Sequence, residues 1–332
     1  MQEFDVIIIG GGPSGIITGI TGKKQNPDKS FLMIKEDDKG LVPCGIPYVF
    51  HDLKGVKDNE MGPKGFINAG GEVLIDRVVE IDTDAKQLST ENEKEYSYGK
   101  LVFATGSSPI IPEFIEGYDL DGVHYIRKRY NYIDKLHSEI EKKKKIVVIG
   151  GGFIGVEVAE QLAKHKDKEV SIVEMEKHCL YQAFSPDFAA KSDKLLTEVG
   201  VNVITEKSVK KILGKDGKVT RVEMADGYQI DADLVISAIG FKPNTDLAKE
   251  SGLELDQNSA IHVDNYLRTS VKDVYAVGDC SATHGFITGR TDNIMLASTA
   301  TAKARVLGYN LSNIKLLRNF YGTLSVFSTE IH

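Results

Sequence analysis

The sequence has few of the features that mark secreted, membrane-spanning or nucleic-acid-binding proteins. Its 332 residues include only three cysteines, at the widely separated positions 44, 179 and 280. A disulfide framework is therefore not expected, which favours a reducing, cytoplasmic setting. No apolar run approaches the roughly 20 residues needed to span a bilayer. The first residues, MQEFDVIIIGGG, lead directly into a predicted strand, so we expect no signal peptide and no membrane partner.

Basic residues are also in the minority. The formal net charge is −7 and the sequence pI is about 5.7, whereas binding to nucleic acid needs a basic surface. The lysine run at 142–145 is expected to be a solvated helix end. The adjacent His178 and Cys179 supply too few ligands for a metal ion, so no metal site is predicted. The length favours two or more domains.

One pattern occurs twice in the chain. Residues 6–15 read VIIIGGGPSG and residues 146–155 read IVVIGGGFIG. Each apolar run is typical of a strand buried on both faces of a parallel sheet, and a helix should follow. In G-x-G-x-x-G the first glycine permits a tight turn, the second admits a pyrophosphate and the third lets helix and strand pack. The helix N-terminus then offers N–H groups to the phosphates. The glycines are Gly10, Gly12, Gly15, Gly150, Gly152 and Gly155. We therefore predict two dinucleotide sites.

An acidic residue about 20 residues after each glycine motif should accept a hydrogen bond from a ribose hydroxyl. Glu174 fills this place in the second copy, and its carboxylate should repel a 2′-phosphate, so NADH is expected in preference to NADPH. In the first copy Lys35 and Glu36 compete for the place. Glu36 is preferred, because a lysine cannot accept a hydrogen bond.

The other apolar segments fit an α/β fold with two Rossmann-like dinucleotide-binding domains, the second inserted in the first. LVFATGSSP at 101–109, LVISAIGFKPNT at 234–245 and VYAVGDC at 274–280 read as strands that end in small or acidic residues. Ligands bind beyond the carboxyl ends of strands in such sheets. Residues 71–82 and 219–235 read as β-rich insertions, the latter with an Asp-Gly hairpin signal.

With ATG at 104–106 and VGD at 277–279, the paired glycine motifs resemble the flavin-dependent pyridine nucleotide–disulfide oxidoreductases. CGIPY at 44–48, beside one unpaired cysteine, is similar to the branch that contains coenzyme A disulfide reductase and NADH oxidase. The resemblance covers almost the whole chain and implies two cofactors, FAD and NAD(P)H. The domains that it implies are an FAD-binding domain of residues 1–112 and 238–312, an NAD(P)H-binding domain of residues 113–237, and the start of a shortened interface domain at 313–332.

The implied interface domain bears on dimerisation. FYGTLSVFS at 320–328 resembles that domain's first strand. Members of the family form homodimers, but this chain stops at His332, which leaves its oligomeric state open.

The resemblance also assigns residues to each cofactor. Val78 should meet the adenine through its backbone, and Ala297 should begin a helix that faces the flavin. Phe153 should gate the nicotinamide site and Glu157 should lie near it, although they also read as a core aromatic and a helix-surface acid. Asp279 could otherwise be a turn residue or helix cap. The residues assigned to FAD are Gly10, Gly12, Pro13, Ser14, Gly15, Glu36, Val78, Ala104, Thr105, Gly106, Gly278, Asp279 and Ala297. The residues assigned to NAD(P)H are Gly150, Gly152, Phe153, Ile154, Gly155, Glu157, Glu174 and Gly240.

Two departures from the family pattern narrow the predicted activity. Two-cysteine members carry the partner of the first cysteine five residues later, where this chain has Val49, so an internal disulfide cycle is excluded. NADH peroxidases and the related oxidases carry a histidine inside the first glycine motif, where this chain has Pro13. This weakens the peroxidase and water-forming oxidase interpretations.

The stretch VPCGIPY makes Cys44 the candidate catalytic residue. Gly45 leaves its sulfur open and Pro47 suits the first turn of a helix, so we expect Cys44 at a helix N-terminus, where the dipole favours thiolate. The resemblance places it against the flavin, as the sulfur that takes the electrons of NADH by disulfide exchange. The alternative is that Cys44 is a small buried hydrophobe, as many free cysteines are.

The predicted function is reduction, with NADH, of a disulfide or persulfide of a small thiol, coenzyme A being the candidate. By similarity Lys23 and Lys24 would receive its phosphates, although exposed lysines are usually only solvated. Three alternatives stay open: an NADH oxidase with Cys44 cycling through sulfenate, a flavoprotein that reduces a partner protein, and a non-catalytic nucleotide-binding scaffold. The sequence does not name the physiological acceptor.

Overall fold

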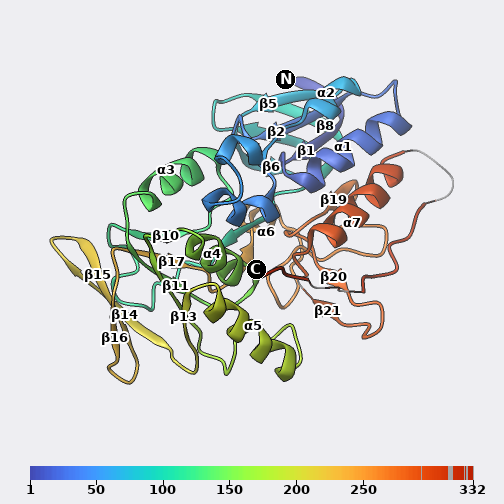
Figure 1. The fold of residues 1–332 in the computed structure, drawn as a ribbon. Coiled ribbons are helices and arrows are strands. Elements are labelled where there is room, and N and C mark those ends of the chain that lie inside the picture. The colour runs from blue at the N-terminus through green and yellow to red at the C-terminus, as the bar shows by residue number, and fades with distance from the viewer. Residues whose placement is uncertain (293, 313–316, 325, 327, 332) are drawn as a thin grey trace. The chain divides into compact units, whose positions relative to one another are not determined.

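The structure is a computed structural model that describes residues 1–292, 294–312, 317–324, 326 and 328–331 (Figure 1). Its contacts divide the chain into two compact units. Unit 1 contains residues 1–40, 61–108 and 242–326, and unit 2 contains residues 41–60, 109–241 and 327–332. The segment that carries Cys44 therefore belongs to unit 2. The assignment of domains to cofactors stays a prediction.

Unit 1 is built on a seven-stranded sheet with the order β5-β2-β1-β8-β7-β6, in which β19 also pairs with β8. The pairs β1/β2, β1/β8, β2/β5 and β8/β19 are parallel, whereas β6/β7 and β7/β8 are antiparallel. The strands are β1 (Gln2–Ile9), β2 (Phe31–Lys35), β5 (Glu72–Ile75), β6 (Val78–Asp82), β7 (Gln87–Thr90), β8 (Glu95–Phe103) and β19 (Val274–Ala276). The predicted β-rich segment at 71–82 is thus two strands at opposite edges of this sheet.

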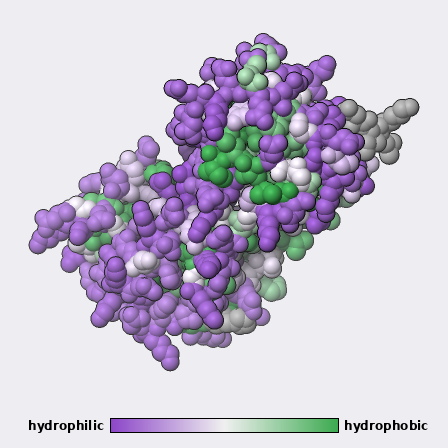
Figure 2. Space-filling model, turned by 90° about the horizontal axis from the view of Figure 1, so that it is seen from above, coloured by the Kyte–Doolittle hydropathy of each residue, from purple (hydrophilic) through white to green (hydrophobic). Residues whose placement is uncertain are grey.

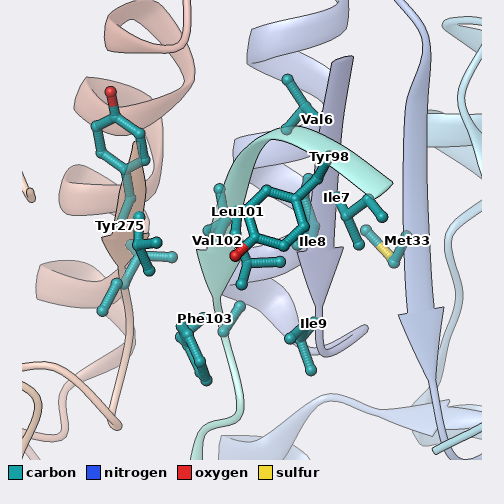
Figure 3. Close-up of a cluster of buried hydrophobic side chains, with 14 of the residues drawn as sticks. Val6, Ile7, Ile8, Ile9, Met33, Tyr98, Leu101, Val102, Phe103 and Tyr275 are labelled. Atoms are coloured by element: carbon teal, nitrogen blue, oxygen red, sulfur yellow. The ribbon is translucent and has the colours of Figure 1, made fainter. Parts of the chain in front are cut away.

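The core of unit 1 lies in the middle of this sheet (Figure 3). The four consecutive residues Val6 to Ile9 are all buried, and so are Leu101, Val102 and Phe103 on the neighbouring strand. Continuous burial of this kind needs cover on both faces of a parallel sheet, and it explains why these strands read as unbroken apolar runs.

The helices of unit 1 include a closely packed pair, α1 (Pro13–Gln25) and α7 (Ala297–Asn310), which lie side by side (Figure 1). Thr18 donates from its hydroxyl to the carbonyl of Ala304, and Gly308 leaves room for Thr21. The smaller elements are α2 (Lys64–Asn68), α6 (Asp246–Glu250) and the hairpin strands β20 (Thr283–His284) and β21 (Thr291–Asp292).

Unit 2 contains an all-parallel five-stranded sheet with the order β10-β17-β11-β12-β13. Its strands are β10 (Val123–Tyr125), β11 (Lys145–Ile149), β12 (Glu169–Val173), β13 (Val201–Ile204) and β17 (Leu234–Ser237). Its helices are α3 (Tyr130–Ile140), α4 (Phe153–Ala163) and α5 (Pro186–Glu198). Both glycine motifs therefore join a strand to a helix, as predicted.

A three-stranded antiparallel sheet completes unit 2, with strands β14 (Val209–Lys215), β15 (Lys218–Met224) and β16 (Gln229–Asp231). Asp226 and Gly227 turn the chain between β15 and β16, and Gly227 has a φ of +86°. The hairpin predicted at this dipeptide is therefore present, because glycine adopts a positive φ without a steric penalty.

Four short strands lie where the chain passes between the units: β3 (Gly40–Leu41), β4 (Glu60–Met61), β9 (Ser107–Pro109) and β18 (Phe241–Pro243). Among the described residues, no helix is long and apolar enough to cross a membrane. Hydrophilic residues cover most of the face in Figure 2, with hydrophobic areas between them.

The predicted strand at 320–328 is only partly described, since positions 325 and 327 lie outside the described residues, as do 313–316 and His332. Thr323 makes an isolated bridge with Gly285. The described part of the segment is otherwise irregular.

Candidate active site

The two glycine motifs adopt the same local geometry. Gly10 and Gly150 have positive φ angles of +112° and +103°, in the region that only glycine enters easily. A Cβ on Gly15 would lie 2.1 Å from the Gly10 carbonyl oxygen, and a Cβ on Gly155 would lie 1.8 Å from that of Gly150. The first and third glycines of each motif are therefore required by the fold.

The second glycine of each motif, Gly12 or Gly152, has open space where a side chain would be. A Cβ on Gly12 or on Gly152 would have no atom within 4 Å, and each of these glycines is the N-cap of its helix with no side-chain cap. The first N–H groups of α1 and α4 therefore face an open cradle without a capping oxygen. This geometry fits a bound pyrophosphate in both units.

The side chain that lies against the middle residue of each Gly-Gly-Gly run, Gly11 or Gly151, differs between the units. A Cβ on Gly151 would lie 2.9 Å from Oε2 of Glu174, whereas a Cβ on Gly11 would lie 2.6 Å from Cδ of Lys35. The strand registers agree, because Lys35 comes directly after the last pair of β2 with β1, and Glu174 comes directly after the last pair of β12 with β11. Lys35 and Glu174 thus occupy equivalent positions.

The carboxylate of Glu174 is held beside the glycine turn. It accepts hydrogen bonds from the N–H groups of Gly151 and Glu176. In unit 1, Glu36 lies one residue beyond the equivalent position, and its carboxylate is 3.9 Å from Arg77. A ribose contact by Glu36 stays a prediction, and the register favours Lys35 for that position.

Several of the other residues assigned to FAD lie where the central strands of unit 1 end. β1, β8 and β19 end in register at this edge. Ser14 lies against Gly278, which has a φ of +84°. Ser107 donates to Asp279 at 2.7 Å.

Of the remaining FAD residues, Ala104 follows β8 directly and its carbonyl oxygen lies against Gly10. Thr105 donates from its hydroxyl to the carbonyl of Asn244, and Gly106 has a φ of +70°. Val78 begins β6 and Ala297 begins α7. The contacts of all these residues with FAD stay predictions.

Lys303 on α7 is a buried residue of unit 1 that sequence reasoning missed. Its ammonium donates to Oγ of Ser281 at 2.6 Å, the carbonyl of Ala282 at 2.7 Å and Oγ1 of Thr283 at 3.0 Å. Burial lowers its pKa to about 7, although the carboxylate of Asp279 opposes this. Lys303 thereby fixes the segment that follows Asp279. Its only signal in the sequence was a lysine among small residues.

The ammonium of Lys23 is hydrogen-bonded to main-chain carbonyl groups of unit 1. Lys23 is buried, and its ammonium donates to the carbonyls of Pro27 and Lys29 at 2.8 and 2.7 Å, which closes the loop after α1. Lys24 is exposed. A contact of either residue with coenzyme A stays a prediction.

Cys44 lies in unit 2 in a short 3-10 turn, Pro43–Gly45, which is followed by a second one, Pro47–Phe50. Pro47 begins a helical turn, as predicted, but no α-helix starts at Cys44, because Pro47 has no N–H to donate to the carbonyl of Pro43, as an α-helix would require. The side chain is exposed, unlike the buried Cys179 and Cys280. The interpretation of Cys44 as a buried hydrophobe is thus wrong.

Asn59 holds this turn in place by hydrogen bonds to Val42. Its side-chain amide donates to the carbonyl of Val42 at 3.0 Å, and its main chain also pairs with Val42. A Cβ on Gly45 would lie only 2.0 Å from Oδ1 of Asn59. Gly45 is therefore needed for close packing as well as for leaving the sulfur open, a role that the sequence did not indicate.

The residues assigned to the nicotinamide lie on or beside α4. Phe153 is its first residue, and its ring makes an edge contact with Phe184, with centroids 5.9 Å apart. Ile154 follows, and Gly240 lies in unit 2 after β17 with a φ of +128°. Burial raises the pKa of Glu157 to about 7, and the nearby Glu160 adds to the effect.

We expect Glu157 to make the stability of the protein depend on pH. Its pKa is raised in the folded state, so its contribution is most favourable below the unfolded value of about 4.5 and is lost as pH rises toward 7. Glu157→Gln should therefore stabilise the protein at pH 8 by roughly 2 kcal/mol more than at pH 5, after allowing for solvent screening. Urea unfolding at both pH values measures this difference. The exposed Glu113→Gln is the control, and equal effects of Glu157→Gln at both pH values would contradict the expectation.

Comparisons with known proteins agree with this geometry. Residues 4–304 match the family described as pyridine nucleotide-disulphide oxidoreductase. An NADH oxidase of Methanocaldococcus jannaschii is 36% identical over 335 residues, which cover 98% of this chain and 73% of that protein. An NAD(P)H coenzyme A polysulfide/persulfide reductase of Pyrococcus horikoshii is 33% identical, with 98% and 73% covered.

A solved NAD-dependent persulfide reductase from A. fulgidus superposes with a TM-score of 0.88 at 32% identity. The match covers 96% of this chain but 60% of the solved chain. The chain therefore spans less than two thirds of the length of that structure.

Proposed function

Because the chain belongs to the pyridine nucleotide-disulphide oxidoreductase family, whose members use FAD and NAD(P)H, we propose that it uses NADH to reduce a persulfide or disulfide of a small thiol through Cys44. The single observation that carries this proposal is the exposed sulfur of Cys44, which lies in a turn that Asn59 holds by a hydrogen bond to Val42. The relatives named for polysulfide, persulfide and sulfur reduction support it.

The chemistry of Cys44 follows from thiol–disulfide exchange. Its thiolate attacks the inner sulfur of a persulfide, R–S–SH, which is the sulfur bonded to the carbon of R. A sulfur–sulfur bond forms to Cys44, the substrate's own sulfur–sulfur bond breaks, and hydrosulfide leaves. Two electrons from NADH then reduce the mixed disulfide, which releases the thiol and restores Cys44. FAD, when bound, carries these electrons from the nicotinamide to sulfur.

The proposed preference for NADH depends on Glu174. Its carboxylate lies beside the glycine turn of unit 2, fixed by two N–H groups. A 2′-phosphate on the ribose would meet this negative charge, whereas a 2′-hydroxyl can donate to it. Coenzyme A as the thiol and the cytoplasm as the location are further parts of the proposal. Two relatives named as coenzyme A-dependent or coenzyme A persulfide reductases support the first.

An NADH oxidase is the second candidate function. The relative from M. jannaschii carries that name, and an exposed cysteine without a partner cysteine can cycle through a sulfenate. Oxygen would then be the acceptor instead of a thiol-bound sulfur.

An anaerobic titration of the FAD-loaded protein with NADH separates these functions. After loading with coenzyme A persulfide, the protein should take up two electrons for the flavin and two more for the sulfur–sulfur bond. A long-wavelength absorbance band, from a thiolate against the flavin, should accompany the uptake. Two-electron bleaching without the band would count against the proposal and favour an oxidase or a reductase of a partner protein. Failure to bleach would favour a nucleotide-binding scaffold.

A further inference from the structure

The segment that follows Cys44 is attached to helix α4 inside unit 2. The turn Pro47–Phe50 packs on α4, and its residues Val49 and Phe50 are buried in the core of this unit. The ring nitrogen Nε2 of His165, just beyond α4, lies 2.7 Å from the carbonyl of Phe50. α4 is also the helix whose N-terminus forms the predicted pyrophosphate cradle.

Gln161 on α4 makes a paired contact with Asp52 in this segment. Its Oε1 accepts from the main-chain N–H of Asp52 at 3.0 Å, and its Nε2 donates to the Asp52 carboxylate at 2.8 Å. The amide is almost completely buried, with 1% of the residue exposed. A buried amide whose oxygen and nitrogen are both hydrogen-bonded fixes how the Asp52 segment is aligned along α4 as well as its distance from the helix. A shift of the segment or of the helix would leave buried polar atoms unpaired.

Charged groups on both sides strengthen this contact. The ammonium of Lys164 lies 2.8 Å from Asp52 and 3.0 Å from the buried Glu160, and Gln161 also donates to Glu160. Burial would raise the pKa of Asp52, but hydrogen bonds from Lys164, His51 and Gln161 hold it well below its usual range. Asp52 therefore stays a carboxylate throughout the physiological pH range.

We propose that Gln161 and Asp52 are a positioning pair that fixes the Cys44 segment on the NADH-binding helix. The inference rests on the proposed function. The contact lies eight residues after the cysteine and six after the third glycine of the motif, so it ties the sulfur-bearing turn to the helix that would hold the nucleotide. Neither residue touches the reacting sulfur.

A charge swap tests the pair in the FAD-loaded protein. Gln161→Glu alone places a new carboxylate beside Asp52 and Glu160 and should loosen the segment. Asp52→Asn in that background restores the pair, because the new amide can donate to the new carboxylate while the main-chain N–H still donates. The exposed Gln257→Glu adds the same charge to unit 1 and serves as the control.

Hydrogen–deuterium exchange of the peptide covering residues 45–53 is the first readout. Exchange should be about tenfold faster in Gln161→Glu than in the wild type and should return to near the wild-type rate in the swap. Gln257→Glu should leave it unchanged. If Gln161→Glu alone does not fold, Gln161→Met removes the same hydrogen bonds without adding charge. Unchanged exchange in both Gln161 variants would overturn the proposal.

The second readout separates this inference from the proposed function. Reduction of the flavin by NADH should stay within about twofold of the wild type in Gln161→Glu, whereas reoxidation by coenzyme A persulfide should slow by about tenfold and recover in the swap. Equal slowing of both steps indicates general damage and rejects a positioning role. If the wild type does not reduce the persulfide at all, the proposed function fails, while the exchange result still decides whether the pair holds the segment.

Discussion

Cys44→Ser should abolish reduction of coenzyme A persulfide, by on the order of a thousandfold or more, as loss of a nucleophile does in other enzymes. A serine hydroxyl is not ionised near neutral pH and cannot form the mixed disulfide, whereas a thiolate can. Reduction of the flavin by NADH should remain, because that step does not use the sulfur. Stopped-flow measurement of the two half-reactions checks both statements.

The other two cysteines cannot replace Cys44. Cys179 and Cys280 are buried, and burial raises the pKa of both thiols. Cys280→Ala is the matched control, and it should keep persulfide reduction per folded molecule despite some loss of stability. Persulfide reduction by Cys44→Ser at the wild-type rate would falsify the proposed role. Consumption of oxygen by both proteins at equal rates would favour an oxidase that does not need the thiol.

The glycine motifs could be predicted from the sequence because their geometry is local. The first and third glycines meet each other within five residues, so the chain has no freedom to satisfy the turn in another way. The buried strands were equally predictable, since parallel strands covered on both faces must be apolar throughout. The fold class therefore follows from short segments alone.

The choice between Lys35 and Glu36 could not be made in the same way. The two residues are adjacent, and sequence spacing from the glycines does not resolve one residue. Strand register does, because neighbouring residues of a strand point to opposite faces. The chemical argument for Glu36 concerned what a ribose prefers, whereas the register reflects where the backbone places each side chain.

The surroundings of Cys44 could be predicted least. Asn59 contacts Val42 from 17 positions away, and Gln161 contacts Asp52 from 109 positions away, so no local pattern in the sequence encodes these contacts. Pro47 does begin a helical turn, as predicted, but this turn is a short 3-10 helix, and Cys44 lies in a separate 3-10 turn before it.

Gly155→Ala should destabilise unit 2 by about 3 kcal/mol, the upper part of the usual range for overpacking. The new methyl group would lie 1.8 Å from the carbonyl oxygen of Gly150. This neighbour is backbone in a turn with a positive φ, so it cannot move aside as a flexible side chain would. Urea unfolding measures the loss. A change below about 0.5 kcal/mol would show that the turn relaxes, and it would contradict the strand–helix packing role of the third glycine.

Gly152→Ala is the matched variant, because it adds the same methyl group three residues earlier in the same motif. No atom lies within 4 Å of its Cβ position. Gly152 has a φ of −74° and a ψ of −177°, which is extended backbone that an ordinary residue can adopt. Its stability should therefore change by less than about 1 kcal/mol, with a gain as the expected direction. Its affinity for NADH should nevertheless fall by about tenfold, because the methyl group would occupy the cradle that the pyrophosphate needs. Calorimetric titration with NADH measures this, and an unchanged affinity would show that the nucleotide does not approach the turn through Gly152. Together the two variants separate what the fold requires of this motif from what the ligand requires.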